Sequence, residues 1–255
     1  LAETKLDLID IGASFDQSLI EDAKALVNQA LAHDPGSSEA YRIMAKAKVM
    51  SGEFELAGPL LQKALDLSPS NSAALIGLAQ LRVMEGDKSA ARQFMQRALR
   101  IDPYGATLLM KLGHLHWADG RPDMARDAFE RGALVHPQNP IFPMLLGMLQ
   151  ALEFGELAGG LHNFLLAAEL DPRDFEIAAY VAMSYLTLGM PEDARPWIDR
   201  AIKLGPLAAT SLALESNWLA QSGDPSAAAN LSVSVLGDER FIYRGHKLLW
   251  EPHYV

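Results

Sequence analysis

The chain has 255 residues, a formal net charge of −10 and no cysteine. The lack of cysteine excludes disulfides, thiol catalysis and cysteine-based zinc sites. The acidic balance argues against a nucleic-acid partner, because binding a phosphate backbone requires a basic surface. No stretch approaches the ~18 consecutive apolar residues of a membrane-spanning helix.

The first residues of the chain do not show the pattern of apolar residues expected of a helix that packs against a neighbour. Aspartates and a glycine stand where apolar residues are expected. We predict an N-terminal arm over residues 1–15, either docked like a strand or left from a preceding segment. Residues 16–37 contain one predicted helix, which forms half of a repeat. Because the first residue is Leu1 and not methionine, we expect a processed form or a piece of a longer protein.

From residue 35 onward, prolines and glycines recur at a nearly constant period. Within each series the gaps are 34 residues except for one gap of 35, and in both series the extra residue falls just before Gly155. Glycine suits a turn inside a helix pair because it accepts a positive φ, and proline ends a helix. The series are Pro35, Pro69, Pro103, Pro137, Pro172 and Pro206, and Gly52, Gly86, Gly120, Gly155, Gly189 and Gly223.

Residues 106–139 show the repeat most completely. The first four motif residues, separated by 3, 1 and 3 positions, are Leu109, Leu112, Gly113 and His116. Ala125 and Phe129 follow, four residues apart, and Pro137 closes the repeat. This resembles the tetratricopeptide repeat (TPR), whose pattern is W-x2-L-G-x2-Y, then A-x3-F, then P over 34 residues. The resemblance implies an all-α fold, a right-handed superhelical solenoid of antiparallel helix pairs.

The same register divides most of the chain into repeats. We predict six of them, at 38–71, 72–105, 106–139, 140–174, 175–208 and 209–236. The last departs from the pattern at Glu215, which either marks an end repeat or places a carboxylate near the core. Residues 237–255 are predicted to form a C-terminal capping helix and tail, which would cover the apolar end of the stack.

In TPR proteins the inner face of each repeat's first helix commonly binds a peptide. In this chain that face is apolar through the middle of the array and carries six of the ten methionines, a residue common on surfaces that fit varied apolar partners. The predicted groove residues are Arg42, Lys46, Met50, Ile76, Gln80, Met84, Met110, His114, Trp117, Met144, Met148, Met183 and Asn217.

Three interpretations of this apolar face remain open. Its side chains belong to the core between neighbouring first helices, or they form a groove for an apolar or amphipathic partner segment, or the chain's own arm or tail fills the groove. Arg42 and Lys46 either hold one acidic group at the groove entrance or form a solvated rim.

The sequence carries no motif for nucleotide binding or metalloprotease chemistry. His114 and His116 lie two residues apart on a predicted helix, about 200° around its axis, so they are not placed to share a metal ion. The glycine-rich stretch Gly155–Gly160 is predicted to be a turn with small packing residues. We therefore expect no catalytic residue, no metal and no cofactor.

The predicted function is a non-enzymatic scaffold or adaptor that binds a partner peptide or helix in the methionine-rich groove. Alternatives are the sensory or regulatory TPR region of a larger bacterial signalling or transcription regulator, and an assembly factor for the envelope or secretion. We expect a soluble protein, cytoplasmic or periplasmic. The sequence leaves the partner, the compartment and the oligomeric state open.

Overall fold

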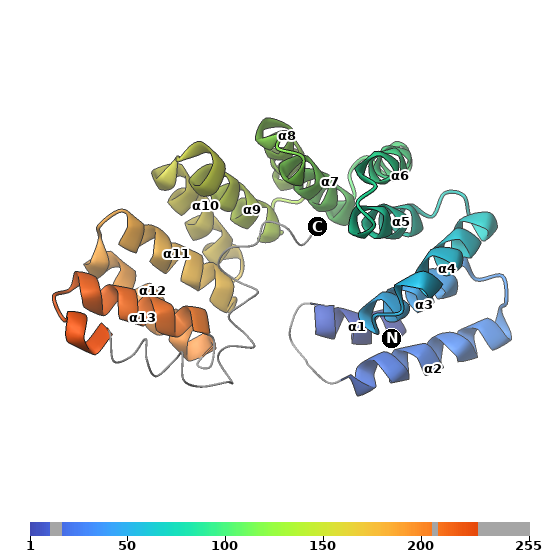
Figure 1. The fold of residues 1–255 in the computed structure, drawn as a ribbon, viewed down its shortest axis with the longest axis horizontal. Helices are drawn as coiled ribbons and strands as arrows, with labels where there is room; N and C mark the ends of the chain where they lie inside the picture. Colours follow the sequence, from blue (N-terminus) through green and yellow to red (C-terminus); the bar gives the residue numbers. More distant parts are fainter. Residues whose placement is uncertain (11–16, 206–208, 229–255) are drawn as a thin grey trace. The chain divides into compact units, whose positions relative to one another are not determined.

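The structure is a computed structural model that describes residues 1–10, 17–205 and 209–228 (Figure 1). Within these ranges the regular elements are all helices, and no strand occurs. The chain divides into two compact units. We call them the N-unit, residues 1–111, and the C-unit, which begins at residue 112.

The N-unit is built from helices that pack on their neighbours in chain order. Its helices are α1 (Ala2–Asp10), α2 (Ser18–His33), α3 (Ser38–Met50), α4 (Phe54–Leu67), α5 (Ser72–Met84), α6 (Lys88–Ile101) and the first part of α7 (Ala106–Ala118). α3 packs against α4, and α5 packs against α6, while α4 joins the two pairs by contacting α5.

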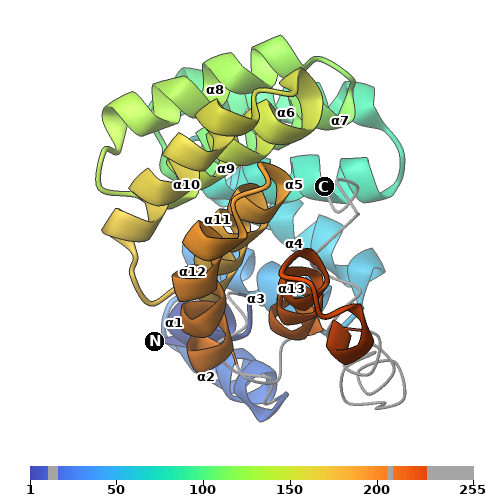
Figure 2. The ribbon, with the colours of Figure 1, turned by 90° about the vertical axis from the view of Figure 1, so that its left-hand side faces the viewer.

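The C-unit continues the same arrangement after α7. Its further elements are α8 (Pro122–Val135), α9 (Ile141–Leu149), the π-helical turn η1 (Gln150–Phe154), α10 (Leu157–Leu170), α11 (Phe175–Thr187), α12 (Pro191–Leu204) and α13 (Ala209–Gln221). Figure 2 shows α10, α11 and α12 lying side by side in chain order. The predicted capping helix over residues 237–255 lies outside the described residues.

The prediction of a strand-like arm at the start of the chain is wrong, because residues 2–10 form helix α1. Leu6 is fully buried and packs with Ile20, Ala23 and Ala47, and Ala2 packs against the same cluster. α1 packs on α2 and contacts α3, as α3 packs on α4 and contacts α5. α1 therefore takes the place of a first helix beside α2, which is not an isolated half-repeat.

The glycine series marks the turns inside the helix pairs, as the sequence predicts. All six glycines of the series have a positive φ, between 68° and 95°. The one long repeat, with its extra residue, holds the π-helical turn η1, and Gly155 follows it as the C-cap. A π-helical turn takes up one more residue than an α-helical turn, so it absorbs the insertion without shifting the register of the following helices.

Glycines inside helices of the C-unit make room for aromatic rings. A Cβ atom at Gly132 would lie 2.0 Å from the ring of Phe142, which is fully buried. A Cβ atom at Gly113 would lie 2.2 Å from the ring of Phe129. The repeat pattern has alanine at the position of Gly132. Glycine stands there because the ring of Phe142 occupies the space that an alanine Cβ atom would need.

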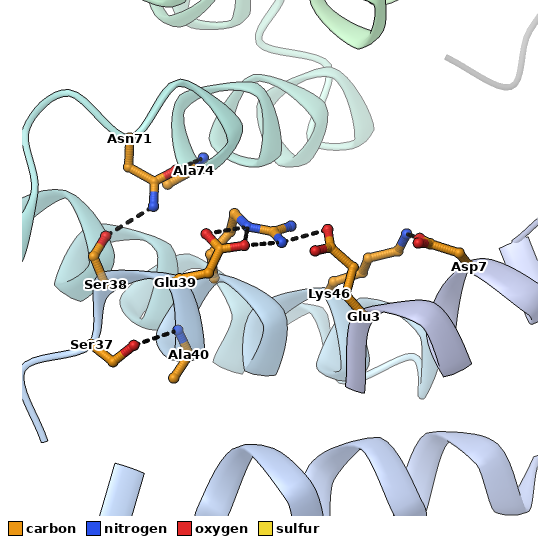
Figure 3. A network of polar contacts seen from close by, with 10 residues as sticks. Glu3, Asp7, Ser37, Ser38, Glu39, Ala40, Lys46, Asn71 and Ala74 are labelled. Atoms are coloured by element: carbon orange, nitrogen blue, oxygen red, sulfur yellow. Dashed lines mark hydrogen bonds and ion pairs between the residues drawn. The ribbon is translucent and has the colours of Figure 1, made fainter. Parts of the chain in front are cut away.

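A polar link sets the spacing between α3 and α5 in the N-unit. The Asn71 amide nitrogen donates to Ser38 Oγ at 2.9 Å, and Ser38 Oγ donates to the Ala64 carbonyl at 2.7 Å. The Asn71 side-chain oxygen accepts from the Ala74 backbone N–H at 2.9 Å and so caps α5 (Figure 3). Side-chain caps satisfy donors that the first turn of a helix leaves unpaired.

Candidate functional site

A groove of about 720 Å³ runs along the first helices of the N-unit. Side chains from α1, α3, α5 and α7 line it, with a contribution from the loop before α7. Seven of the predicted groove residues are among them: Arg42, Lys46, Met50, Ile76, Gln80, Met84 and Met110. The structure therefore brings together the predicted residues of α3 and α5 with Met110 of α7, but not His114 or Trp117.

The floor of the groove is mostly apolar, and part of it is open to solvent. Ile76 and Leu108 are buried beneath the surface. Met84, at the end of α5, is 53% exposed although it is a large apolar side chain. An apolar surface that is both concave and exposed is typical of a site that binds another molecule.

Ion pairs between α1 and α3 form one wall of the groove (Figure 3). Arg42 is 9% exposed, and its guanidinium donates to Glu39 and to Glu3. Lys46 Nζ donates to Asp7 Oδ1 at 2.7 Å. Arg42 and Lys46 thus each meet a carboxylate of α1.

The pKa shifts of Arg42 and Glu39 reflect this pairing. Burial by itself lowers the pKa of Arg42, but hydrogen bonds and charge attraction from Glu39 and Glu3 outweigh it, so the pKa is raised. The hydrogen bond from Arg42 lowers the pKa of Glu39. Both groups therefore stay ionised near neutral pH.

The expectation of a solvated rim at Arg42 and Lys46 is therefore wrong, and the acidic groups that they hold come from the same chain. Sequence reasoning missed Glu3 and Asp7. Their spacing of four residues matches the spacing of Arg42 and Lys46, and groups four apart share one face of a helix. That match was a usable signal once residues 2–10 were assigned to a helix.

The predicted groove residues of the C-unit have other surroundings. Met144 and Met148 pack against the core cluster that contains Phe164 and Val181, and Met183 packs against a second cluster. The two α9 methionines are therefore partly buried against a core cluster. None of these three residues lines the N-unit groove.

The polar residues predicted on the same face of the C-unit contact their own neighbours. The His114 ring meets the Phe129 ring edge-on, with centroids 5.7 Å apart. Trp117 Nε1 donates to Glu153 Oε1 at 2.6 Å, and so ties α7 to the π-helical turn. Asn217 is exposed and accepts a hydrogen bond from Gln221 at 3.0 Å.

The repeat pattern has a buried apolar residue at position 215. Glu215 stands there instead, and it forms an ion pair. Arg195 Nη1 donates to both Glu215 carboxylate oxygens at 2.8 Å. Arg195 also pairs with Asp199, and its guanidinium lies over the Trp218 ring, 4.6 Å from the centroid. The hydrogen bonds that Arg195 donates to Asp199 and Glu215 raise the pKa of Arg195. The carboxylate therefore sits near the core with its charge compensated.

Among the residues that the structure describes, no group of three or more His, Cys, Asp or Glu side chains is placed to hold a metal ion. No helix in the described ranges is long and apolar enough to cross a membrane.

Two family models, both described as tetratricopeptide repeat, match the chain. One matches residues 48–103, and the other matches residues 13–72 and 110–175. The chain belongs to the tetratricopeptide repeat family. This confirms the resemblance and the all-α solenoid fold, and it makes the chain a protein-interaction scaffold in general terms. No curated protein matches it.

Solved structures share the fold at low sequence identity. PilF of Pseudomonas aeruginosa is 21% identical with a TM-score of 0.69, over 81% of this chain and 96% of PilF. PilW, a type IV pilus biogenesis factor, is 18% identical with a TM-score of 0.69, over 81% of this chain and 97% of PilW. YrrB, a TPR protein with an unusual peptide-binding site, is 23% identical with a TM-score of 0.51, over 73% of this chain and 95% of YrrB.

Proposed function

We propose that the N-unit groove binds an apolar or amphipathic segment of a partner protein, and that the chain acts as a non-enzymatic adaptor. One observation carries the proposal: a groove of about 720 Å³ joins an apolar floor to an exposed methionine, Met84. A groove of this volume falls in the range, roughly 300–1,000 Å³, that holds a drug-sized ligand. It therefore accepts a few side chains of a partner segment.

The chemistry of the groove favours apolar side chains over an isolated carboxylate. Arg42 and Lys46 already pair with carboxylates from α1. The rest of the lining includes the apolar side chains of Val49, Met84 and Met110, which a partner can contact directly. Methionine side chains are flexible and polarisable, so they adapt to partners of different shape.

An assembly factor for the envelope or secretion is a second candidate. The observation that favours it is the fold shared with PilW, a type IV pilus biogenesis factor, over 97% of that protein. At 18% identity this likeness carries the fold alone. Identifying the partner that occupies the groove tests this candidate as well.

The test selects peptides from a display library against the immobilised full chain and measures their affinity for two variants. Met84→Glu/Met110→Glu places two charges in the groove. Met124→Glu is the matched control, because Met124 is 45% exposed on α8 and does not line the groove. Circular dichroism verifies that each variant folds.

We expect the selected peptides to be apolar or amphipathic. Their affinity for Met84→Glu/Met110→Glu should be at least ten times lower than their affinity for the control variant Met124→Glu. A tenfold loss corresponds to about 1.4 kcal/mol of binding free energy. Peptides that bind both variants as tightly as the unmodified chain would show that the groove is not the binding site.

A further inference from the structure

We propose that α1 occupies a site at which a partner helix binds. The partner helix resembles α1, because it carries two carboxylates four residues apart and a leucine between them. On α1 these residues are Glu3, Leu6 and Asp7. This inference rests on the proposed function of the groove. It specifies the kind of partner helix that binds to the groove along α3.

The contacts of α1 with α3 include a complementary charge pattern, beside the apolar packing of Leu6 and Ala2 and an ion pair from Lys5 to Asp22 of α2. Glu3 pairs with Arg42, and Asp7 pairs with Lys46, so two charges on one helix face two opposite charges on the next at the same spacing (Figure 3). Leu6 lies between them and fills an apolar site. A helix with Lys at the two acidic positions would face like charges there, so the site selects by charge as well as by apolar fit.

α1 is the shortest helix of the N-unit. It has nine residues, and a helix of that length is marginal in water without tertiary contacts. Leu6 is its one fully buried side chain among those described. The side chains of Glu3 and Asp7 are roughly half exposed, and ion pairs of exposed side chains contribute little to stability. Elements with few buried contacts open before the rest of a domain does.

Opening of α1 would enlarge the groove with a surface of matching chemistry. Arg42 and Lys46 line the groove already, and Leu6 covers Ile20, Ala23 and Ala47 next to them. An incoming acidic, leucine-bearing helix would replace the contacts of α1 one for one, while its other residues extend over the apolar floor. α1 then acts as a tethered competitor that raises the affinity a partner needs.

The test uses a labelled peptide with the sequence of residues 1–10 and the full chain, with binding measured by fluorescence anisotropy. Leu6→Ala in the chain loosens α1 without altering the docking surface, and we expect it to tighten peptide binding at least tenfold. On the peptide side, Glu3→Lys/Asp7→Lys should abolish binding. The peptide Thr4→Lys, changed at an exposed position, is the control and should retain it.

A charge exchange provides the decisive arm. The chain Arg42→Glu/Lys46→Glu repels its own α1 and should bind the Glu3→Lys/Asp7→Lys peptide at least ten times more tightly than the unmodified peptide. Equal affinity for both peptides would overturn the proposal. If the variants do not fold, amide hydrogen exchange on the unmodified chain decides: α1 amides should exchange at least ten times faster than α3 amides, and equal rates contradict the inference.

Two outcomes separate this inference from the proposed function and from another occupant. If display-selected peptides depend on Met84 and Met110 but the residue 1–10 peptide binds no form of the chain, the proposed function stands and this inference fails. If the chain forms dimers whose population rises with concentration and falls in Leu6→Ala, α1 exchanges between two copies. The occupant is then a second copy and not a partner.

Discussion

Helices α3 and α9 hold equivalent places in their repeats, yet their inner side chains meet different surroundings. On α3, Arg42 and Lys46 form ion pairs along the wall of a groove. On α9, Met144 and Met148 pack against a core cluster that contains Phe164. An inner position of a TPR helix is therefore not a binding position by itself, because the neighbouring helix decides whether a side chain stays open or becomes core.

Aromatic residues account for the difference. The C-unit core around α9 contains the stacked rings of Phe164 and Tyr180, whose centroids lie 5.1 Å apart. These rings fill space up to the methionines, and sulfur makes favourable contacts with aromatic rings. In the N-unit the equivalent positions hold Leu61 and Gly77, which are smaller and line the groove.

The largest expected effect on stability comes from replacing a methionine with glutamate in each unit. Met148→Glu should destabilise the protein by about 3 kcal/mol, because it puts a carboxylate against a packed core. Met84→Glu should change stability by less than about 0.5 kcal/mol, as exposed substitutions usually do. Urea unfolding of the two variants measures both values, and equal losses would contradict the contrast between open and core methionines.

The second prediction concerns alkaline pH and the C-unit core. Burial, with a smaller contribution from the charges of Glu176 and Asp174, raises the pKa of Tyr180 to about 12. An unfolded tyrosine ionises near pH 10. Between these values the unfolded chain loses the proton and the folded chain keeps it. The stability contribution is therefore complete below pH 10 and falls by about 2.5 kcal/mol as the pH rises to 12.

Tyr180→Phe keeps the ring and removes the ionisable hydroxyl, so it should remove this part of the pH dependence. The measurement compares urea unfolding of the two proteins at pH 8, 10, 11 and 12, which cancels the titration of all other groups. Parallel losses of stability in both proteins would show that Tyr180 does not ionise differently in the folded chain.

A third prediction exchanges glycine and alanine at one repeat position in the two units. Gly132→Ala should cost about 1–2 kcal/mol, because the clash with the buried Phe142 ring outweighs the better helix propensity of alanine. Ala98→Gly, at the equivalent and fully buried position of the N-unit, should cost about 1 kcal/mol or more through lost propensity.

The double variant Gly132→Ala/Phe142→Leu identifies the cause. If the aromatic ring is responsible, the double variant is less destabilised than the sum of its two single changes. Additive losses, measured by thermal or urea unfolding, would mean that Phe142 does not determine the residue at position 132.

The smallest expected effect concerns the compensated carboxylate of α13. Glu215→Leu restores the repeat pattern, and it should change stability by less than about 0.5 kcal/mol. Arg195 keeps its ion pair with Asp199 in this variant, so no charge is left without a partner. A loss of 2 kcal/mol or more on unfolding would show that the Arg195–Glu215 pair supplies a large share of the C-unit's stability.

Prediction from sequence succeeded where the backbone itself sets the constraint. The six turn glycines have a positive φ, and the one extra residue sits at the π-helical turn before Gly155. It failed at residues 2–10, because tertiary contacts, among them the burial of Leu6 and ion pairs with α2 and α3, stabilise a helix that its own apolar pattern does not indicate.

The inner face shows the same limit for the candidate site. Helical spacing placed all thirteen candidate residues on one face of the first helices, but it does not report the volume of the side chains opposite them. Met84 is open, whereas Met148 meets Phe164 and its neighbours. Both are methionines on first helices of the repeat.

The sequence by itself determined the family, the helix pairs and the register, because glycine and proline act on the backbone of their own turn and recur every 34 or 35 residues. Only the tertiary structure decided which inner positions form a groove and which carboxylates meet Arg42 and Lys46. Those outcomes depend on the size and charge of side chains on neighbouring helices, which a period along the chain does not encode.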